Sequence, residues 1–313
     1  MDRQKAERMI ANIERIIIGK SEVVELVVAT LLAGGHVLLE DVPGVGKTTL
    51  AKTLANTIDC GFTRIQFTPD TLPSDITGLN VYNMKHSEFE FVKGAVMNHI
   101  ILGDEINRTS PKTQASLLEA MEEHQVTVDA VTYPLPKPFM VIATQNPIDS
   151  LGTYQLPEAQ LDRFMMKLRI GYPDDKQEKS IIQYKLSKRE EGKTEVEAVV
   201  TKEEVLCMMR EVEEIYVQED LIEYVIEIMN RTRKSLRLSL GASPRATIML
   251  IKASQAYAYL QGREFVIPED ILYLAPFVLP HRFLISQEGR INAYTAEQIL
   301  GDILKEVRIP VLT

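Results

Sequence analysis

The stretch that decides the fold of this 313-residue chain is Gly35-His36-Val37-Leu38-Leu39-Glu40-Asp41-Val42-Pro43-Gly44-Val45-Gly46-Lys47-Thr48-Thr49-Leu50. Residues 37–39 are apolar and suit a buried strand, and the glycine-rich turn after them leads into a helical segment. Such a turn is a P-loop, because its backbone N–H groups converge at a helix N-terminus and bind phosphate. The residues expected to bind a nucleotide are Gly44, Val45, Gly46, Lys47, Thr48 and Thr49.

Two side chains of the P-loop have predictable roles. Lys47 is expected to reach the β- and γ-phosphates of ATP, and the hydroxyl of Thr48 to coordinate Mg²⁺. The usual pattern, G-x-x-x-x-G-K-S/T, begins with glycine, whereas this chain has Asp41 at that position. The departure leaves Gly44 and Gly46 in place, and these two residues shape the phosphate cradle. We therefore predict a nucleotide site rather than a glycine turn with a lysine nearby by chance.

A second motif, residues 99–105, is an apolar run that ends in two acids. After a P-loop this is the pattern of a Walker B strand, in which Asp104 holds the metal and Glu105 activates the attacking water as general base. An Asp-Glu pair after a strand is by itself a common solvated turn, so the interpretation depends on the P-loop upstream. The water-activating glutamate favours a hydrolase over a small-metabolite kinase. The two motifs together predict a magnesium-dependent ATPase.

Polar residues further along the chain extend this set. Asn146 follows the apolar run 139–143 and is placed to orient the attacking water, although an Asn-Pro turn also explains it. Arg163 and Arg245 are of the type that stabilises charge in phosphoryl transfer, in cis or from a neighbouring subunit. Single arginines are usually surface ion-pair partners, so only the surrounding pattern indicates these two. Arg108 is a weaker candidate for the trans-acting arginine.

Strand and helix signals alternate through the first half of the chain. They predict an α/β fold with a mainly parallel sheet and helices on both faces. Two segments interrupt the alternation and have the pattern of projecting β-hairpins: residues 79–92, and a segment that begins at Gln125 and closes through residues 134–138. The apolar runs expected as strands of the main sheet are 37–39, 64–67, 99–102, 139–143 and 166–170.

Strand signals stop after Asp174, and helix signals continue to the end of the chain. Thr201 with Glu204 forms a possible capping box, and Ser243 before Pro244 has the pattern of a helix start. We therefore divide the chain into an α/β nucleotide-binding core, residues 1–175, and a smaller all-helical domain, residues 176–313.

Composition limits the remaining possibilities. The net charge of −9 argues weakly against broad electrostatic binding to nucleic acid or to anionic membranes. No apolar run approaches the ~20 residues that a membrane-spanning helix needs. The two cysteines are far apart in the sequence and suggest a reducing compartment. With no signal-peptide pattern at the N-terminus, we expect a cytoplasmic protein.

Longer stretches resemble the MoxR family of AAA+ ATPases, in the helix-2-insert clade, and the resemblance covers nearly the whole chain. The most specific of them are GHVLLE (35–40), QFTPD (66–70), PSDITG (73–78), DEINR (104–108), QASLLEAMEE (114–123) and LPEAQLDRF (156–164). Departures are small: Gly103 stands where alanine is common, and His281 where arginine or lysine is expected.

The resemblance implies an AAA+ P-loop core followed by a helical lid, and it assigns roles that spacing cannot. Asn146 matches the sensor 1 residue, Arg163 the arginine finger and Arg245 the sensor 2 residue of the lid. The hairpin at residues 79–92 matches the helix-2 insert. The residues placed where such proteins contact the adenine are Ile17, Ile18 and Gly19.

The resemblance also implies partners. An arginine finger acts in trans, so the chain is expected to form a homo-oligomer, typically a hexameric ring. Such proteins drive chaperone-like remodelling or maturation of protein partners, often proteins with a von Willebrand factor A domain. Two other functions stay open: the motor subunit of a metal-insertion complex similar to magnesium chelatase, and a nucleotide-switched module that binds DNA or protein without useful turnover. DNA binding is disfavoured because the sequence has no helix-turn-helix, zinc finger or strongly basic tail.

Overall fold

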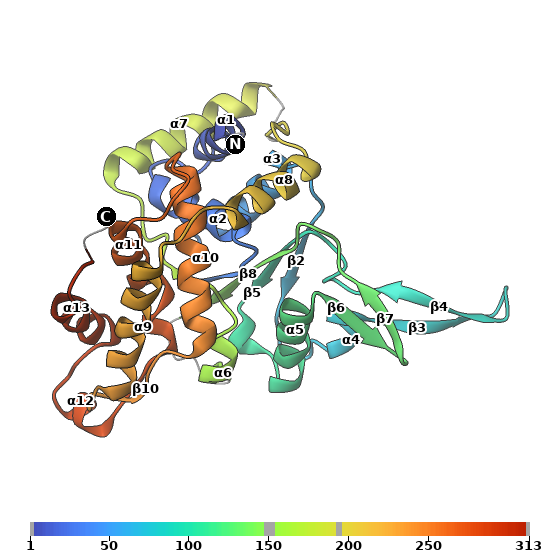
Figure 1. Ribbon diagram of the computed structural model, residues 1–313. Helices are drawn as coiled ribbons and strands as arrows, with labels where there is room; N and C mark the ends of the chain where they lie inside the picture. Colours follow the sequence, from blue (N-terminus) through green and yellow to red (C-terminus); the bar gives the residue numbers. More distant parts are fainter. Residues whose placement is uncertain (1–2, 147–153, 192–195, 311–313) are drawn as a thin grey trace.

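The computed structural model describes residues 3–146, 154–191 and 196–310 (Figure 1). At its centre is a five-stranded sheet with the strand order β2-β5-β8-β1-β9, and every neighbouring pair of strands is parallel. The predicted parallel sheet is confirmed, with a strand at each of the five expected places. These strands are β1 (Val37–Glu40), β2 (Phe62–Gln66), β5 (Ile100–Asp104), β8 (Met140–Gln145) and β9 (Met166–Leu168).

Side chains alternate across the strands, so neighbouring residues of one strand enter two different hydrophobic cores. Leu39 belongs to the larger core and Leu38 to the smaller one, and Ile100 and Ile101 divide in the same way. The larger core contains α1 (Arg3–Glu14), α2 (Ser21–Leu32), α3 (Lys47–Thr57) and the lid helices. The smaller core contains α4 (Pro73–Thr77) and α5 (Pro111–Glu123), and the short helix η1 (Ile106–Arg108) precedes α5. Helices therefore cover both faces of the sheet.

Both predicted hairpins are present, and Figure 1 shows that the first one extends furthest from the rest of the molecule. They consist of β3 (Gly78–Asn83) with β4 (Glu88–Lys93), and of β6 (Gln125–Val128) with β7 (Val131–Pro134).

The second hairpin closes sooner than predicted. Asp129 and Ala130 both have positive φ, 48° and 65°, and form a two-residue turn between its strands. The two hairpins are held together where Phe91 stacks on Tyr133, with ring centroids 3.9 Å apart.

The C-terminal part forms the predicted helical lid. Thr201 and Glu204 form the expected capping box, and Ser243 accepts a hydrogen bond from the N–H of Ala246 (3.1 Å) at the start of α10. Between α9 and α12, a short antiparallel pair adds two strands that the all-helical prediction did not contain. Segments of two and three residues are too short to show a periodic pattern. The elements are α6 (Glu158–Leu161), α7 (Asp175–Glu191), α8 (Lys202–Glu213), α9 (Glu219–Lys234), β10 (Leu238–Leu240), α10 (Pro244–Leu260), α11 (Pro268–Val278), η2 (Pro280–Arg282), β11 (Leu284–Ile285), α12 (Gln287–Ile291) and α13 (Ala296–Glu306).

All strands of the sheet run in one direction, so their carboxyl ends lie along one side of it and their amino ends along the opposite side. We call the edge where the strands end the carboxyl edge, and the edge where they begin the amino edge. The larger core continues from the sheet into the lid helices, and the domain division near residue 175 stays a prediction. Among the described residues, no helix combines the length and the apolar character needed to cross a membrane.

Candidate nucleotide site

The P-loop lies at the carboxyl edge, between β1 and α3. Gly44 and Gly46 have φ values of 90° and 97°, a left-handed conformation that favours glycine. Apart from the adjoining residues, no atom of the described part of the chain lies within 4 Å of where a Cβ of either residue would stand, so the space over the turn is open among these residues. Gly46 is the N-cap of α3, and as a glycine it has no side chain that could cap the helix. The first N–H groups of this helix are therefore available to an anion.

Asp41 and Lys47 determine how the loop is held. Lys47 Nζ donates to the carbonyl oxygens of Asp41 (2.9 Å) and Val42 (3.2 Å), so the lysine closes on its own loop. The buried Asp41 carboxylate accepts hydrogen bonds from the backbone N–H groups of Ile170 and Gly171, just after β9. The residue that replaces the consensus glycine therefore anchors the start of the P-loop to the neighbouring strand.

The two Walker B acids follow β5 at the same edge. Thr144 of β8 connects them, because its Oγ1 accepts from the N–H of Glu105 (2.9 Å) and donates to Asp104 Oδ1 (2.7 Å). Glu105 has φ 57°, in the left-handed region that only a few per cent of non-glycine residues adopt. The buried Thr144 hydroxyl thus holds the Asp104 side chain and the backbone of Glu105.

Two residues of β2 complete this arrangement, and sequence reasoning missed both. Arg64 donates one hydrogen bond to Asp104 Oδ2 (2.6 Å) and another to Gln66 Oε1 (2.7 Å). Gln66 Nε2 donates to Glu105 Oε2 (3.1 Å), which also accepts from Arg108 (2.9 Å). Arg64 and Gln66 are two residues apart on a strand and share one face. Two polar residues on one face of a strand were the available signal.

These side chains converge on one cleft of about 380 Å³. We call it the nucleotide cleft. It brings together most of the predicted site: the P-loop, both acids and Asn146, which lies just after β8. Its lining consists of Asp41, Pro43, Gly44, Gly46, Lys47, Thr48, Thr49, Arg64, Gln66, Asp104, Glu105, Thr144 and Asn146.

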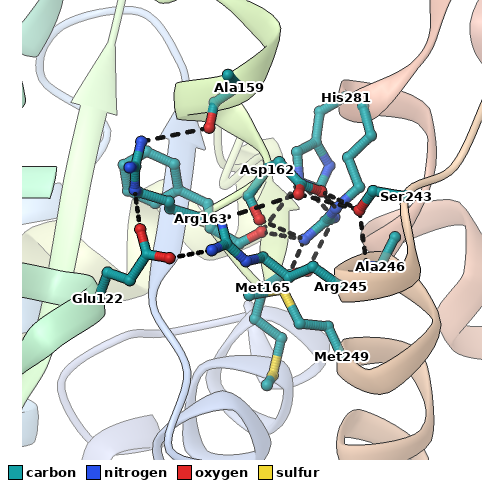
Figure 2. A network of polar contacts seen from close by, with 12 residues as sticks. Glu122, Ala159, Asp162, Arg163, Met165, Ser243, Arg245, Ala246, Met249 and His281 are labelled. Carbon is teal, nitrogen blue, oxygen red and sulfur yellow. Dashed lines mark hydrogen bonds and ion pairs between the residues drawn. The ribbon is translucent and has the colours of Figure 1, made fainter. Parts of the chain in front are cut away.

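Arg163 and Arg245 do not line this cleft. They meet at Glu122, in the last turn of α5: Arg163 Nε donates to Glu122 Oε2 (2.7 Å) and Arg245 Nη2 donates to Oε1 (Figure 2). Asp162 is close to the second arginine, with 4.0 Å between its Oδ2 and Arg245 Nη1. We call Glu122, Asp162, Arg163 and Arg245 the arginine cluster.

The arginine cluster lies at the amino edge, and His36 shows this directly. His36 precedes β1, and its backbone oxygen accepts from the N–H of Met165, two residues after Arg163 (2.8 Å). Its Nε2 donates to the carbonyl oxygen of Met121, next to Glu122 (3.1 Å). The length of β1 therefore separates the cluster from the P-loop of the same chain. Four residues at ~3.3 Å each give a separation of about 10 Å or more.

Comparisons with known proteins agree with this geometry. Residues 36–166 match the model of the ATPase family associated with various cellular activities (AAA), and residues 230–303 match that of the AAA lid domain. The chain is 39% identical to Chaperone MoxR1 of Mycobacterium tuberculosis, over 97% of this chain and 82% of the relative. The chain belongs to the MoxR family of AAA+ ATPases.

Two further similarities extend over almost the full length. The Uncharacterized protein YeaC of Bacillus subtilis is 50% identical over 97% of this chain and 94% of its own length. The crystal structure of a putative ATPase from Cytophaga hutchinsonii superimposes with a TM-score of 0.92 at 39% identity, covering 99% of this chain and 96% of that one. The MoxR-family fold, a P-loop core with a helical lid, and an ATPase activity are thereby established.

The lid is attached to the arginine cluster through partly buried polar contacts. Ser243 donates to Asp162, with 3.0 Å to either carboxylate oxygen, and Arg282 Nε donates to Asp162 Oδ1 (2.9 Å). Burial lowers the pKa of Arg282 to about 10, so its guanidinium stays charged at neutral pH. The resemblance led us to expect a cation at position 281. Arg282 supplies one a residue later, whereas the buried His281 has its pKa lowered well below the usual value, by burial first and Arg282 second.

The residues predicted to contact the adenine lie outside the nucleotide cleft. Ile17 is buried, whereas Ile18 and Gly19 are at least partly exposed between α1 and α2, and none of the three lines the nucleotide cleft. Gly19 has φ 74°, and its carbonyl oxygen accepts from Gln177 Nε2 of α7 (3.1 Å). The assignment of these residues to the adenine stays a prediction.

Proposed function

We propose that this MoxR-family ATPase hydrolyses Mg²⁺·ATP at the interface between two copies of itself, and that the cycle remodels or matures protein partners in the cytoplasm. The observation that supports this most is the position of Arg163 and Arg245. They lie at the amino edge, whereas the nucleotide cleft of the same chain lies at the carboxyl edge. Many P-loop enzymes combine phosphate-binding groups with an arginine that stabilises the charge of the transition state. The two arginines therefore serve the cleft of a neighbouring subunit.

The same separation supports a ring. A contact that joins the amino edge of one subunit to the carboxyl edge of the next is heterologous, and repeating it closes a ring where the rotation allows. Six subunits are the number that the family resemblance implies. Arg108 is the weaker candidate for the trans-acting arginine, because its partner Glu105 lines the nucleotide cleft of its own chain.

The residues of the cleft fit a magnesium ion. Thr48 and Asp104 bring hydroxyl and carboxylate oxygens to one cleft, and Mg²⁺ prefers oxygen ligands. When bound, the ion neutralises charge on the phosphates. Lys47 would exchange its bonds to the carbonyl oxygens of residues 41 and 42 for phosphate oxygens, and the N–H groups at the start of α3 would bind the same phosphates.

Glu105 and Asn146 act on the attacking water in this proposal. Glu105 lies on the cleft wall with its backbone held by Thr144, and its carboxylate accepts the proton of the water. Asn146 reaches the cleft from β8 and orients that water. In its present position the Glu105 carboxylate is bound by Gln66 and Arg108, so these bonds must be exchanged before it can act as a base.

Mixed subunits test the interface. A Glu105→Gln subunit lacks its own base but keeps a working arginine, and an Arg163→Ala subunit has the reverse defect. If Arg163 acts in trans, mixing the two inactive variants restores ATPase activity, because about a quarter of randomly formed interfaces combine the intact halves. No restoration, in mixtures whose co-assembly is verified, would contradict the trans assignment.

Protein clients are supported by the relative named Chaperone MoxR1 and by the projecting β3–β4 hairpin. Contiguous exposed apolar surface marks interaction sites in soluble proteins. In this hairpin Met84 is 87% exposed and Phe89 is 72% exposed, and Leu79, Val81, Tyr82 and Val92 are also exposed.

Capture of clients tests this part of the proposal. The Glu105→Gln variant, loaded with ATP, should retain proteins that contain a von Willebrand factor A domain, and should release them when ATP is left out. Adding Phe89→Ser to this variant tests the hairpin, and the double variant should retain less of these proteins in the presence of ATP. Retention that does not depend on the nucleotide would contradict ATP-driven remodelling.

A further inference from the structure

The carboxylate of Glu122 occupies the centre of the arginine cluster. Each of its oxygens accepts a hydrogen bond from a different arginine: Arg163, which lies between α6 and β9, and Arg245 in the first turn of the lid helix α10. Figure 2 shows Glu122 with one dashed line to each of the two arginines. A single carboxylate thus joins a core arginine to a lid arginine.

Other acceptors among the described residues contribute less to holding this pair. Arg163 also donates to the carbonyl oxygen of Ala159, at a longer 3.3 Å, and the Asp162 oxygen is 4.0 Å from Arg245. Asp162 is itself bound by Ser243 and Arg282. The hydrogen bond from Arg163, and then the charge of Arg245, lower the pKa of Glu122. In the part of the chain that the structure describes, Glu122 is therefore the main counter-ion of both arginines.

The chemistry of this contact resembles that of phosphate binding. Guanidinium groups bind carboxylates and phosphates with the same N–H donors, and two of them around one oxyanion form an anion site. The side chains are not deeply buried: Arg163 is 28%, Glu122 33% and Arg245 37% exposed. Ion pairs at such exposure are weak enough to be exchanged for another anion.

We propose that Glu122 is the positioning residue of the arginine pair, holding Arg163 and Arg245 in place of phosphate until the nucleotide of a neighbouring subunit replaces it. This inference rests on the proposed function of the two arginines across the interface. In a free subunit the carboxylate neutralises the pair and keeps the two guanidinium groups together. At the interface, the γ-phosphate in the neighbour's cleft competes for the same donors. The release of Glu122 then couples lid helix α10 to the nucleotide of the next subunit.

The chain offers a matched control. Glu123 is the next residue of α5 and is exposed, and among the described residues no hydrogen bond or ion pair joins it to either arginine. Glu122→Gln and Glu123→Gln change the net charge equally and keep the side-chain shape. Only the first variant removes the competing anion from the arginine pair.

ATP-dependent assembly distinguishes the proposed role from a merely structural one, because losing a structural contact would not make assembly easier. In the Glu105→Gln background, which is expected to bind ATP without turnover, sedimentation against subunit concentration gives the midpoint of ATP-dependent assembly. We expect Glu122→Gln to lower this midpoint about three- to tenfold, because the arginines no longer have to leave a carboxylate. Glu123→Gln should stay within about twofold of the background. Equal midpoints for the two variants, or a higher one for Glu122→Gln, would overturn the proposal.

Steady-state kinetics with intact Glu105 provide a second readout. We expect Glu122→Gln to lower the ATP concentration at half-maximal rate and to leave kcat within about twofold. A kcat that falls about tenfold with unchanged assembly would mean that Glu122 supports the arginines during the reaction, and would also overturn the proposal. The mixed-subunit experiment separates a failure of this proposal from a failure of the proposed function. If mixing restores activity but Glu122→Gln behaves as Glu123→Gln, only the role of Glu122 is wrong.

Discussion

In the proposed function, the two edges of the sheet bear complementary halves of an ATPase site, and the charged groups of both halves are paired within the chain. At the carboxyl edge, Arg64 donates a hydrogen bond to Asp104, and Lys47 donates to two backbone carbonyl oxygens. At the amino edge, the Glu122 carboxylate lies between Arg163 and Arg245. Protein groups thus occupy the places proposed for a metal ion and for phosphates. The proposals therefore imply that a free subunit exchanges contacts at both edges before it hydrolyses ATP.

The two regions also differ in how they are built. The nucleotide cleft is formed mainly by the ends of strands and the segments that follow them, so local patterns predict most of its residues. The arginine cluster combines α5, the segment before β9 and the lid helix α10, which are more than 35 residues apart in the sequence. A change in the lid should therefore disturb the amino edge and leave nucleotide binding at the carboxyl edge intact.

The largest effect is expected at the carboxyl edge. Glu105→Gln should lower turnover about a thousandfold and leave ATP affinity nearly unchanged, because the amide cannot accept the proton of the water. Steady-state ATPase rates and binding of a fluorescent ATP analogue check both parts. Lys47→Ala, by contrast, should lose the binding itself. Turnover that Glu105→Gln leaves unchanged would remove this residue from the mechanism.

The next effect distinguishes the two edges. Arg245→Ala should lower kcat about a hundredfold, as expected for the loss of one charge-stabilising donor, without weakening ATP binding by the isolated subunit. Arg231→Ala is a suitable control, because Arg231 lies on lid helix α9 and pairs with Glu227 and Glu306 instead. Weaker ATP binding by isolated Arg245→Ala subunits would place this arginine at its own cleft.

Acid should weaken the amino edge in particular. Burial lowers the pKa of His36 to about 4 from the usual 6.5, so the unfolded chain binds the proton more readily than the folded one. The stability that neutral His36 provides is complete above pH 6.5 and is lost as the pH falls from there towards 4. Between pH 7 and 5 this amounts to about 2 kcal/mol in the free energy of unfolding.

Urea denaturation of the wild type and of His36→Gln at both pH values measures this loss. The difference between pH 7 and 5 should shrink by about 2 kcal/mol in the variant. Equal pH dependence of the two proteins would contradict the assignment. The buried His281, with its lowered pKa, should add a loss of the same sign to both.

The smallest effect concerns the cation on the Walker B acid. Arg64→Gln should lower the Mg²⁺ concentration for half-maximal nucleotide binding about three- to tenfold, because Arg64 and a metal ion compete for Asp104 Oδ2. Nucleotide binding in EDTA should weaken, since one positive charge leaves the cleft. Titration with a fluorescent nucleotide measures both. Arg169→Gln is the control, because Arg169 Nη2 pairs with Glu40 Oε2 (2.6 Å) and neither residue lines the cleft. An unchanged Mg²⁺ requirement would show that the Arg64–Asp104 contact is not competitive.

Sequence reasoning identified most of the cleft because its residues are close together along the chain. The P-loop is one turn, Asp104 and Glu105 end one strand, and Asn146 ends another, and parallel strands bring such ends to one edge. The same reasoning missed Thr144, Arg64 and Gln66. Their role depends on strand register, and Gln66 lies beside Asp104 only because β2 is the neighbour of β5.

The sequence by itself determined the MoxR-family resemblance, the five strands and the chemical nature of the nucleotide site, since apolar periodicity and glycine-rich turns act locally. It also singled out Arg163 and Arg245, but it did not show where they meet. Only the tertiary structure placed them with Glu122 at the amino edge, away from Lys47 of the same chain. The physical reason is that contacts between a core helix and a lid helix depend on how the two helices pack, and no local sequence pattern encodes that packing.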